Sequence, residues 1–148
     1  MKTLISFLAA TLIGFAATAQ STELLFQQYI QVKDALVSSD SRAAAVQAAA
    51  LQQMLETSWG GQEYAPLLQS AKNIAATTDL NTQRKVFAVL SVSVWQIVKS
   101  KGGIQRTVYY QYCPMKKAYW LSQDATIRNP YYGAQMLTCG SVSDKKHP

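Results

Sequence analysis

The chain has 148 residues, of which 14 are Lys or Arg, 8 are Asp or Glu and one is His, so its formal net charge is +6 and its pI is about 9.4. This length allows one domain, and 49% hydrophobic residues against 15% charged residues exclude a disordered chain. Two cysteines exclude a dense disulfide framework and a four-cysteine zinc site. The chain has a single histidine, His147, next to its C-terminal residue, which argues against a histidine-based catalytic triad.

The first 19 residues have the pattern of a secretory signal peptide. Lys2 supplies the positive charge, residues 4–17 are almost wholly apolar, and the Ala-Thr-Ala at 17–19 is a cleavage site of the A-x-A type. The apolar run is shorter than the 18 or more residues of a membrane-spanning helix, so we expect no membrane anchor after cleavage. The sequence predicts cleavage after Ala19, a single mature domain over 20–148, and a periplasmic or secreted location.

Residues 22–101 contain four segments with the periodicity of amphipathic helices. The first, over 22–39, places Leu25, Tyr29, Val32 and Leu36 on one face at spacings of three and four. We expect further helices over 42–57, from about Pro66, and from about 80 to 101. Four such segments with short connections predict an up-down four-helix bundle over about 22–101. A buried structural role is expected for Met54, Phe26, Phe87 and Trp95.

The connections between these segments contain residues that end and begin helices. Asp40 or Ser41 can cap the second helix, and Thr78 or Asp79 can cap the fourth, because their side-chain oxygens accept bonds from free N–H groups. The glycines at 60–61 and 102–103 end the second and fourth helices.

From residue 104 the hydrophobic period changes. Residues 107–112 are rich in β-branched and aromatic side chains, residues 113–117 interrupt them, and 118–122 form a returning strand. The sequence therefore predicts a β-hairpin/loop segment over about 104–142 packed on the bundle, and a fold that is mainly α. Residues 99–148 hold 8 basic and 2 acidic residues, so the positive charge gathers in this part of the chain.

Two pairs of sulfur residues stand in the C-terminal segment: Cys113 with Met115, and Met136 with Cys139. Side chains two apart share a face of a strand, and side chains three apart share a face of a helical turn. Thiolates and thioethers prefer Cu(I), and the similar Ag(I), over hard divalent ions. The four residues are thus a candidate metal site, and no other cofactor is indicated.

The alternative is a disulfide bond between Cys113 and Cys139. In an oxidising compartment two cysteines usually pair, and this bond would close 25 intervening residues. The chain-entropy relation gives such a bond about 3.5 kcal/mol of stabilisation. The methionines would then fill gaps in the core. The protein would be a non-catalytic structural or interaction module, and the two interpretations can also be two redox states of one site.

Several strings in the C-terminal half resemble an exported bacterial family, the domain of unknown function number 3347. They are YCPM at 112–115, YWLS at 119–122, IRNPYYG at 127–133 and ML-x-CG at 136–140, and the first helix agrees at 29–40. This resemblance extends over about residues 22–142. Cys113, Met115, Met136 and Cys139 all match the family pattern, whereas the loop after Cys-Pro-Met is shorter here.

The resemblance implies a soft-metal role. Members of that family occur alone after a signal peptide, or attached to periplasmic adaptor subunits of copper/silver efflux pumps. It therefore implies a periplasmic efflux adaptor as a partner, while the basic residues Lys116, Lys117 and Arg128 indicate an acidic-surfaced protein. Export argues against nucleic acid as a ligand for these basic and aromatic residues.

No enzyme is predicted, because the chain has no G-x-S-x-G, no pair of ligating histidines and no C-x-x-C. His147 could supply a nitrogen ligand, but we expect it to lie in a frayed tail. Trp120 could contact a bound cation through its ring, but we expect it in the core.

Overall fold

Four helices come first in the chain and three strands follow. The computed structural model describes residues 7–148, and their side chains from residue 21 onward. The expected signal peptide, residues 1–19, lies outside the described side chains, and its cleavage stays a prediction. The helices are α1 Phe7–Val37, α2 Ser41–Ser58, α3 Ala65–Ala75 and α4 Leu80–Lys101; the strands are β1 Val108–Cys113, β2 Ala118–Ser122 and β3 Ser141–Lys146; and two short 3-10 helices are η1 Gln62–Tyr64 and η2 Gly133–Met136.

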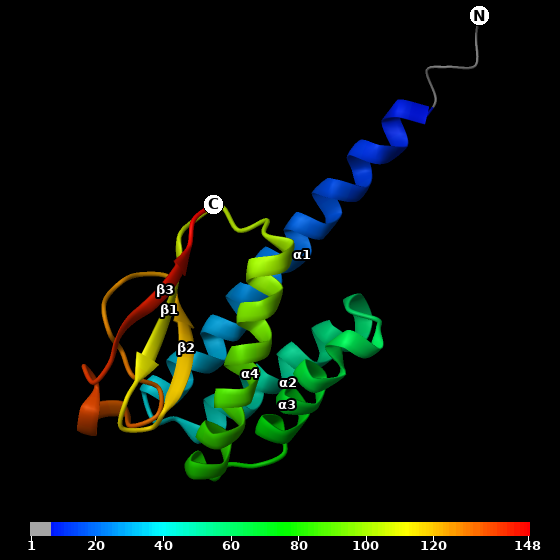
Figure 1. Cartoon of the computed structure of the whole chain (residues 1–148). Helices are drawn as coiled ribbons and strands as arrows, with labels where there is room; N and C mark the ends of the chain where they lie inside the picture. Colours follow the sequence, from blue (N-terminus) through cyan, green and yellow to red (C-terminus); the bar gives the residue numbers. More distant parts are fainter. Residues whose placement is uncertain (1–6) are drawn as a thin grey trace, which may run out of the picture.

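The helices form one layer and the sheet forms a second layer beside them (Figure 1). Each helix packs against the next one in the chain, and α4 also packs against α1, which closes the bundle. The predicted four-helix bundle with a C-terminal β segment is confirmed. Among the described residues, none of the helices combines the length and the apolar composition needed to cross a lipid bilayer.

The helix ends follow the predicted capping signals. Asp40 precedes α2, and its side chain accepts the N–H of Ala43 at 2.9 Å. Asp79 precedes α4, and its side chain accepts the N–H of Thr82 at 2.8 Å. Gly102 ends α4 with a φ of 63°, a left-handed conformation that costs glycine little. The local chemistry of these connections therefore fixes the helix boundaries.

The core is shared by the helices and the sheet. The predicted core aromatics Phe26 and Phe87 are fully buried, and so is Trp120 on β2, which confirms its expected structural place. Trp95 is 7% exposed, and Met54 is partly buried against the core. Each such side chain contributes about 1.5–3 kcal/mol through its removal from water.

The sheet is antiparallel, with the strand order β2-β1-β3. The predicted hairpin is confirmed, with Tyr112 opposite Tyr119 and Cys113 opposite Ala118. The expectation of a frayed tail is wrong, because residues after 140 form β3 along the other edge of β1. The side chains of β3 are almost all exposed, so this strand lacks the alternating apolar pattern that reveals a half-buried strand. Its backbone instead forms hydrogen bonds with the N–H and C=O groups along the edge of β1 that β2 does not pair with.

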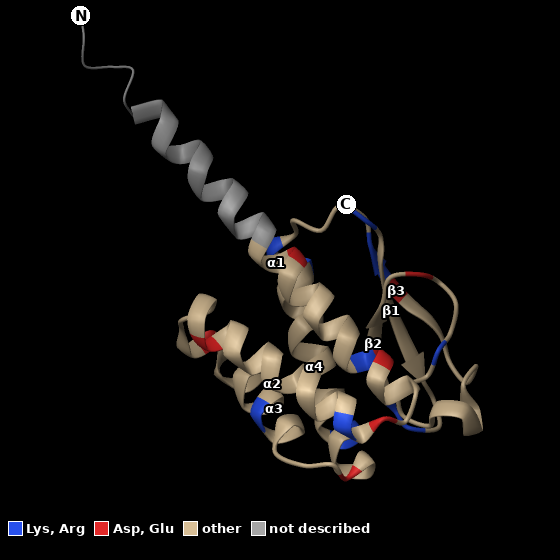
Figure 2. Cartoon of the chain, turned by 180° about the vertical axis from the view of Figure 1, so that it is seen from behind, with Lys and Arg blue, Asp and Glu red and all other residues tan. Residues whose placement is uncertain are grey.

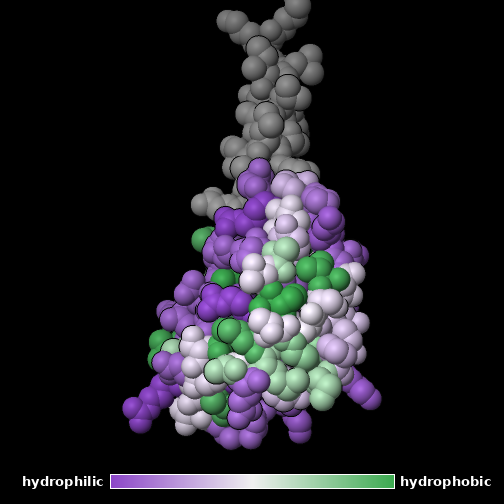
Figure 3. Space-filling view, turned by 90° about the vertical axis from the view of Figure 1, so that its left-hand side faces the viewer, coloured by the Kyte–Doolittle hydropathy of each residue, from purple (hydrophilic) through white to green (hydrophobic). Residues whose placement is uncertain are grey.

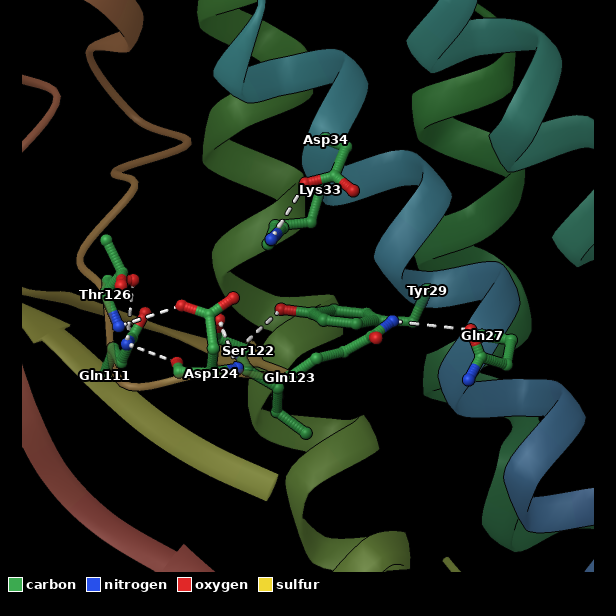
Figure 4. Close-up of polar contacts among 10 residues, drawn as sticks. Gln27, Tyr29, Lys33, Asp34, Gln111, Ser122, Gln123, Asp124 and Thr126 are labelled. Carbon is green, nitrogen blue, oxygen red and sulfur yellow. Dashed lines mark hydrogen bonds and ion pairs between the residues drawn. The ribbon is translucent and has the colours of Figure 1, made fainter. Parts of the chain in front are cut away.

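Stacked aromatic rings join the sheet to the bundle. The ring of Trp95 on α4 stacks on Tyr110 at 4.6 Å, and Tyr110 stacks on Tyr119 at 4.7 Å. Offset stacking of this kind adds about 0.5–1.5 kcal/mol per pair to the gain from burial. A second connection is polar: Gln123, just after β2, donates to Gln27 on α1 at 3.3 Å (Figure 4). The sheet is thus held against both α1 and α4.

Candidate functional site

Cys113 is the last residue of β1 and is fully buried. The four residues after it, 114–117, form the turn that leads into β2. Lys117 takes a left-handed φ of 54° in this turn, which lets the chain reverse within four residues. The short turn therefore leaves Cys113 inside and places Met115, which is 64% exposed, outside.

Cys139 is positioned by a loop between β2 and β3. The side chain of Asn129, which is fully buried, donates to the carbonyl of Cys139 at 2.8 Å and accepts the N–H of Tyr131 at 2.8 Å. The backbone N–H of Asn129 also donates to Leu137 at 2.8 Å. At the other end, the N–H of Cys139 donates to Met136 at 3.0 Å. One buried amide thus fastens both ends of this loop.

Gly140 lets Cys139 approach the sheet closely. Its φ is 145°, and a Cβ added there would lie 2.8 Å from Trp120 Cη2 and 2.8 Å from the carbonyl oxygen of Tyr112. Contacts below 3.0 Å are too short for carbon, so no larger residue fits without a shift of the loop. The close packing of Gly140 against Trp120 and Tyr112 therefore explains why a glycine follows Cys139.

The structure brings the two cysteines together. Their sulfur atoms are 3.8 Å apart, and both thiols are free, so the expected disulfide bond is not formed here. The backbone N–H of Lys116 lies 3.4 Å from the sulfur of Cys113 and donates to it.

The two thiols influence each other electrostatically. Burial raises the pKa of the Cys139 thiol, and the hydrogen bond and charge of Cys113 raise it further. A hydrogen bond from the backbone of Met115 opposes this rise in pKa. Without an external cation, Cys139 therefore remains a protonated thiol at neutral pH.

The two methionines border this pair in different ways. Met115 stands in the turn between Cys113 and β2, and its backbone lies against Cys139. Met136 ends η2 and is partly buried, three residues before Cys139. Within residues 21–148, no three His, Cys, Asp or Glu side chains gather into a metal-binding group. A metal at the two cysteines would therefore need thioethers or backbone groups as further ligands.

His147 lies far from the cysteines. Its Nδ1 atom is 3.2 Å from the hydroxyl oxygen of Thr107, beside the start of β1, whereas Cys113 is the last residue of that strand. Five strand steps from Val108 to Cys113 span about 16 Å. His147 is therefore too far from Cys113 to bind the same metal ion.

The surface around the sheet is basic and partly apolar. Lys145 and Lys146 lie at the C-terminal end of β3, which is blue in Figure 2, and Asp144 precedes them. The side of the molecule that carries the sheet also shows a patch of hydrophobic surface among hydrophilic residues (Figure 3). In the C-terminal segment, the exposed large hydrophobic residues are Met115 and Val142, which is 40% exposed.

Sequence reasoning missed the role of Asn129. Its only signal was the Asn-Pro-Tyr-Tyr-Gly string, which indicates a turn but not a buried amide that fixes a cysteine. It also missed Lys33, a lysine on α1 that is 6% exposed and pairs with Asp34 at 2.8 Å (Figure 4). Lysines are rarely buried, so neither composition nor periodicity marks such a residue.

The comparisons with known proteins give one match. No curated protein and no solved structure matches the chain. A family model described as "Protein of unknown function (DUF3347)" matches residues 25–106, more than half of the 148 residues. The matched range covers α2, α3, α4 and the C-terminal part of α1, and it ends before Cys113, so it does not include the four sulfur residues. On this match, the chain belongs to the family of proteins of unknown function DUF3347.

Proposed function

We propose that this protein binds a soft monovalent ion, Cu(I) or Ag(I), at Cys113 and Cys139. The observation that carries the proposal is the distance of 3.8 Å between two free sulfur atoms. A thiolate–metal bond is about 2.3 Å long, and two such bonds at a tetrahedral angle hold their sulfurs about 3.8 Å apart. The spacing thus supports two thiolates as ligands of one ion.

Met115 and Met136 complete the proposed ligand set as thioethers. Each is joined to a cysteine by the backbone: Met115 through its hydrogen bond to Cys139, and Met136 through its carbonyl, which accepts the N–H of Cys139. Soft thioethers bind Cu(I) and Ag(I) without a change of charge. Binding would displace the thiol protons, and no covalent chemistry on a substrate is involved.

The experiment is an anaerobic titration of the reduced protein with Cu(I) in the presence of a competing chelator. We expect one ion per chain, and a loss of at least about 100-fold in affinity for the double variant Cys113→Ser, Cys139→Ser. His147→Ala and Met54→Leu are controls. The first removes an imidazole and the second removes a thioether, and both residues lie away from the two cysteines. Unchanged affinity in the double cysteine variant would exclude this site.

We propose an exported location and a role in heavy-metal tolerance. The signal-peptide pattern supports export, and the resemblance to a family with efflux-associated members supports transfer of the ion to an efflux system. Cell fractionation with N-terminal sequencing tests the first point: the mature chain should begin at Gln20. Recovery of an uncleaved cytoplasmic chain would contradict export.

A second candidate function is a structural module stapled by a Cys113–Cys139 bond. The same distance favours it, because two thiols 3.8 Å apart need little movement to form a bond in an oxidising compartment. Intact-mass analysis after alkylation, with and without reductant, separates the candidates. Full alkylation without reductant in protein purified from the periplasm would exclude a permanent staple.

A further inference from the structure

The outward side of α4 carries an apolar strip between α3 and β2. Val89 is 55% exposed and Val92 is 40% exposed, and they are neighbours on this helix. In Figure 1, α4 lies in front of the bundle, with the sheet on its left and α2 and α3 on its right. A lone exposed valine needs no explanation, but adjacent ones beside hollows indicate a contact surface.

Two hollows flank Val89. One, of 340 Å³, lies between α4 and β2 and is lined by Val92, Lys117 and Tyr119 among others. The other, of 420 Å³, lies between α3 and α4, where Pro66, Lys85 and Val86 are among its lining residues. Val89 lines both hollows, so it stands as a ridge between two grooves. Helices pack by placing side-chain ridges into grooves of this kind.

The surface extends along the helix. A third hollow, of 420 Å³, shares Pro66 with the second hollow and Ser93 with the first, and it reaches Lys101. From Lys85 to Lys101, α4 rises about 24 Å at 1.5 Å per residue. The grooved surface therefore has the length of a partner helix of about 16 residues.

The rim of this surface is mostly basic. Lys85, Lys101 and Lys117 are exposed, and Glu63, at the η1 end, is the acidic residue among the lining residues of these hollows. If a second copy bound face to face, the same lysines would oppose one another, because a two-fold interface uses the same patch on both chains. Charge complementarity instead favours an acidic partner.

We propose that this grooved face of α4 docks an amphipathic helix of another protein whose apolar strip is bordered by Asp or Glu. The ridge at Val89 separates two rows of partner side chains, and the three lysines pair with the acidic border. The sulfur residues of the proposed metal site do not line this face, so the inference stands apart from metal binding.

The test uses two synthetic helical peptides of about 16 residues with the same leucine strip. One peptide has a glutamate border and the other has a lysine border. Amide chemical shifts of the isotope-labelled full chain report where each peptide binds. We expect the glutamate peptide to shift amides of α4 between Lys85 and Lys101 and of β2 at Ala118 and Tyr119, and to bind about tenfold more tightly than the lysine peptide.

Variants on the exposed surface sharpen this test without disturbing the core. Val89→Lys should weaken binding of the glutamate peptide about tenfold, because it places a charged group where the apolar strip of the peptide would pack between the two hollows. Val46→Lys is the matched control: Val46 is 64% exposed on α2, and its substitution should change affinity less than twofold. The double variant Lys85→Glu, Lys117→Glu should reverse the preference between the two peptides.

Three outcomes would overturn the proposal. The first is an absence of shifts on α4 with either peptide, and the second is equal binding of both peptides. The third is a concentration-dependent dimer of the free protein that Val89→Lys abolishes, since the face would then belong to a second copy of the chain.

Discussion

The hydroxyl oxygen of Tyr29 on α1 accepts the backbone N–H of Leu121 on β2 at 3.0 Å (Figure 4). Tyr29 is fully buried, and its hydroxyl also lies 2.7 Å from the hydroxyl oxygen of Ser91 on α4. Ser91 in turn donates to the carbonyl of Phe87 at 2.8 Å. A continuous buried network therefore joins two helices to the sheet, in a core where an unpaired N–H group is costly.

The first prediction concerns this network. Tyr29→Phe keeps the ring and its stacking on Phe87 at 5.1 Å, but it leaves the N–H of Leu121 without its acceptor. We expect the free energy of unfolding to fall by about 1–3 kcal/mol, measured by urea denaturation. The double variant with Ser91→Ala should lose less than the sum of the two single losses, because both residues belong to one network.

Tyr132→Phe is the control for this change. Tyr132 is half-buried, and in the part of the chain described here its hydroxyl has no hydrogen-bond partner. We expect its substitution to change stability by less than about 0.5 kcal/mol. Equal losses for the two tyrosine variants would contradict the importance of the buried network.

The second prediction is an alkaline loss of stability. Burial raises the pKa of Tyr110 to about 12, with a smaller effect of Tyr119, and burial also raises the pKa of Tyr131 well above its usual value. A group with a raised folded pKa contributes stability that is fully present below its unfolded pKa, about 10, and lost as pH rises through the folded value. We therefore expect stability to fall above pH 10.

Absorbance near 295 nm measures tyrosine ionisation directly. Tyr110 should ionise only near pH 12, or together with unfolding, and Tyr131 should ionise only well above the usual pKa of a tyrosine. Tyr110→Phe should remove one group from this late phase and reduce the slope of stability against pH. A single transition of all tyrosines near pH 10, with circular dichroism unchanged, would contradict this burial.

The sequence predicted the helices well because their signals are local. Each helix has an apolar period, and Asp40, Asp79 and Gly102 mark boundaries through their own side chains or conformation. β3 carries no such signal. Its residues are mostly exposed, and one irregularity in its pairing lies opposite Tyr110/Gln111. Only the unpaired edge of β1, a tertiary property, explains why this polar tail becomes a strand.

The candidate site was predictable in part. Residue type and spacing pointed to the two cysteines. The structure places their sulfurs 3.8 Å apart, with Cys113 at the end of β1 and Cys139 in the loop before β3. The expectation of a frayed tail at His147 was wrong, because β3 pairs with β1 and places His147 beside Thr107, at the end of β1 away from Cys113. Asn129 could not be found by pattern, since its two hydrogen bonds depend on how the loop folds back.

The third prediction tests how Gly140 positions Cys139. Gly140→Ala adds a carbon 2.8 Å from Trp120 Cη2 in a backbone conformation that suits only glycine. We expect a loss of about 2–4 kcal/mol in the free energy of unfolding, from strain and overpacking together. The reaction of Cys139 with a thiol reagent, measured spectroscopically, should become faster because the loop moves away from the sheet.

Gly60→Ala is the matched control, because a Cβ added at Gly60 meets nothing within 4 Å. It should change the free energy of unfolding by less than about 1 kcal/mol and leave the thiol reaction unchanged. If Gly140→Ala behaved in the same way, the packing of Gly140 against Trp120 would not be what positions Cys139.

The fourth prediction separates the role of Met115 from that of the two cysteines in the proposed metal site. Met115 is 64% exposed, whereas Cys113 is fully buried and Cys139 is intermediate, so an arriving ion meets the thioether first. Met115→Leu keeps an apolar side chain of similar size in the turn but removes the sulfur. We expect Cu(I) transfer from a chelator complex, measured by stopped-flow absorbance, to slow by about tenfold, which corresponds to about 1.4 kcal/mol in the barrier.

The equilibrium affinity should fall much less than the rate, because the two thiolates of the buried cysteines supply most of the binding energy. Met54→Leu is the control: Met54 is partly buried on α2 and should affect neither the rate nor the affinity. If Met115→Leu left the rate unchanged while the cysteine variants abolished binding, the ion would enter without Met115. If the cysteine variants also bound Cu(I) normally, the thiol pair itself would not be the site.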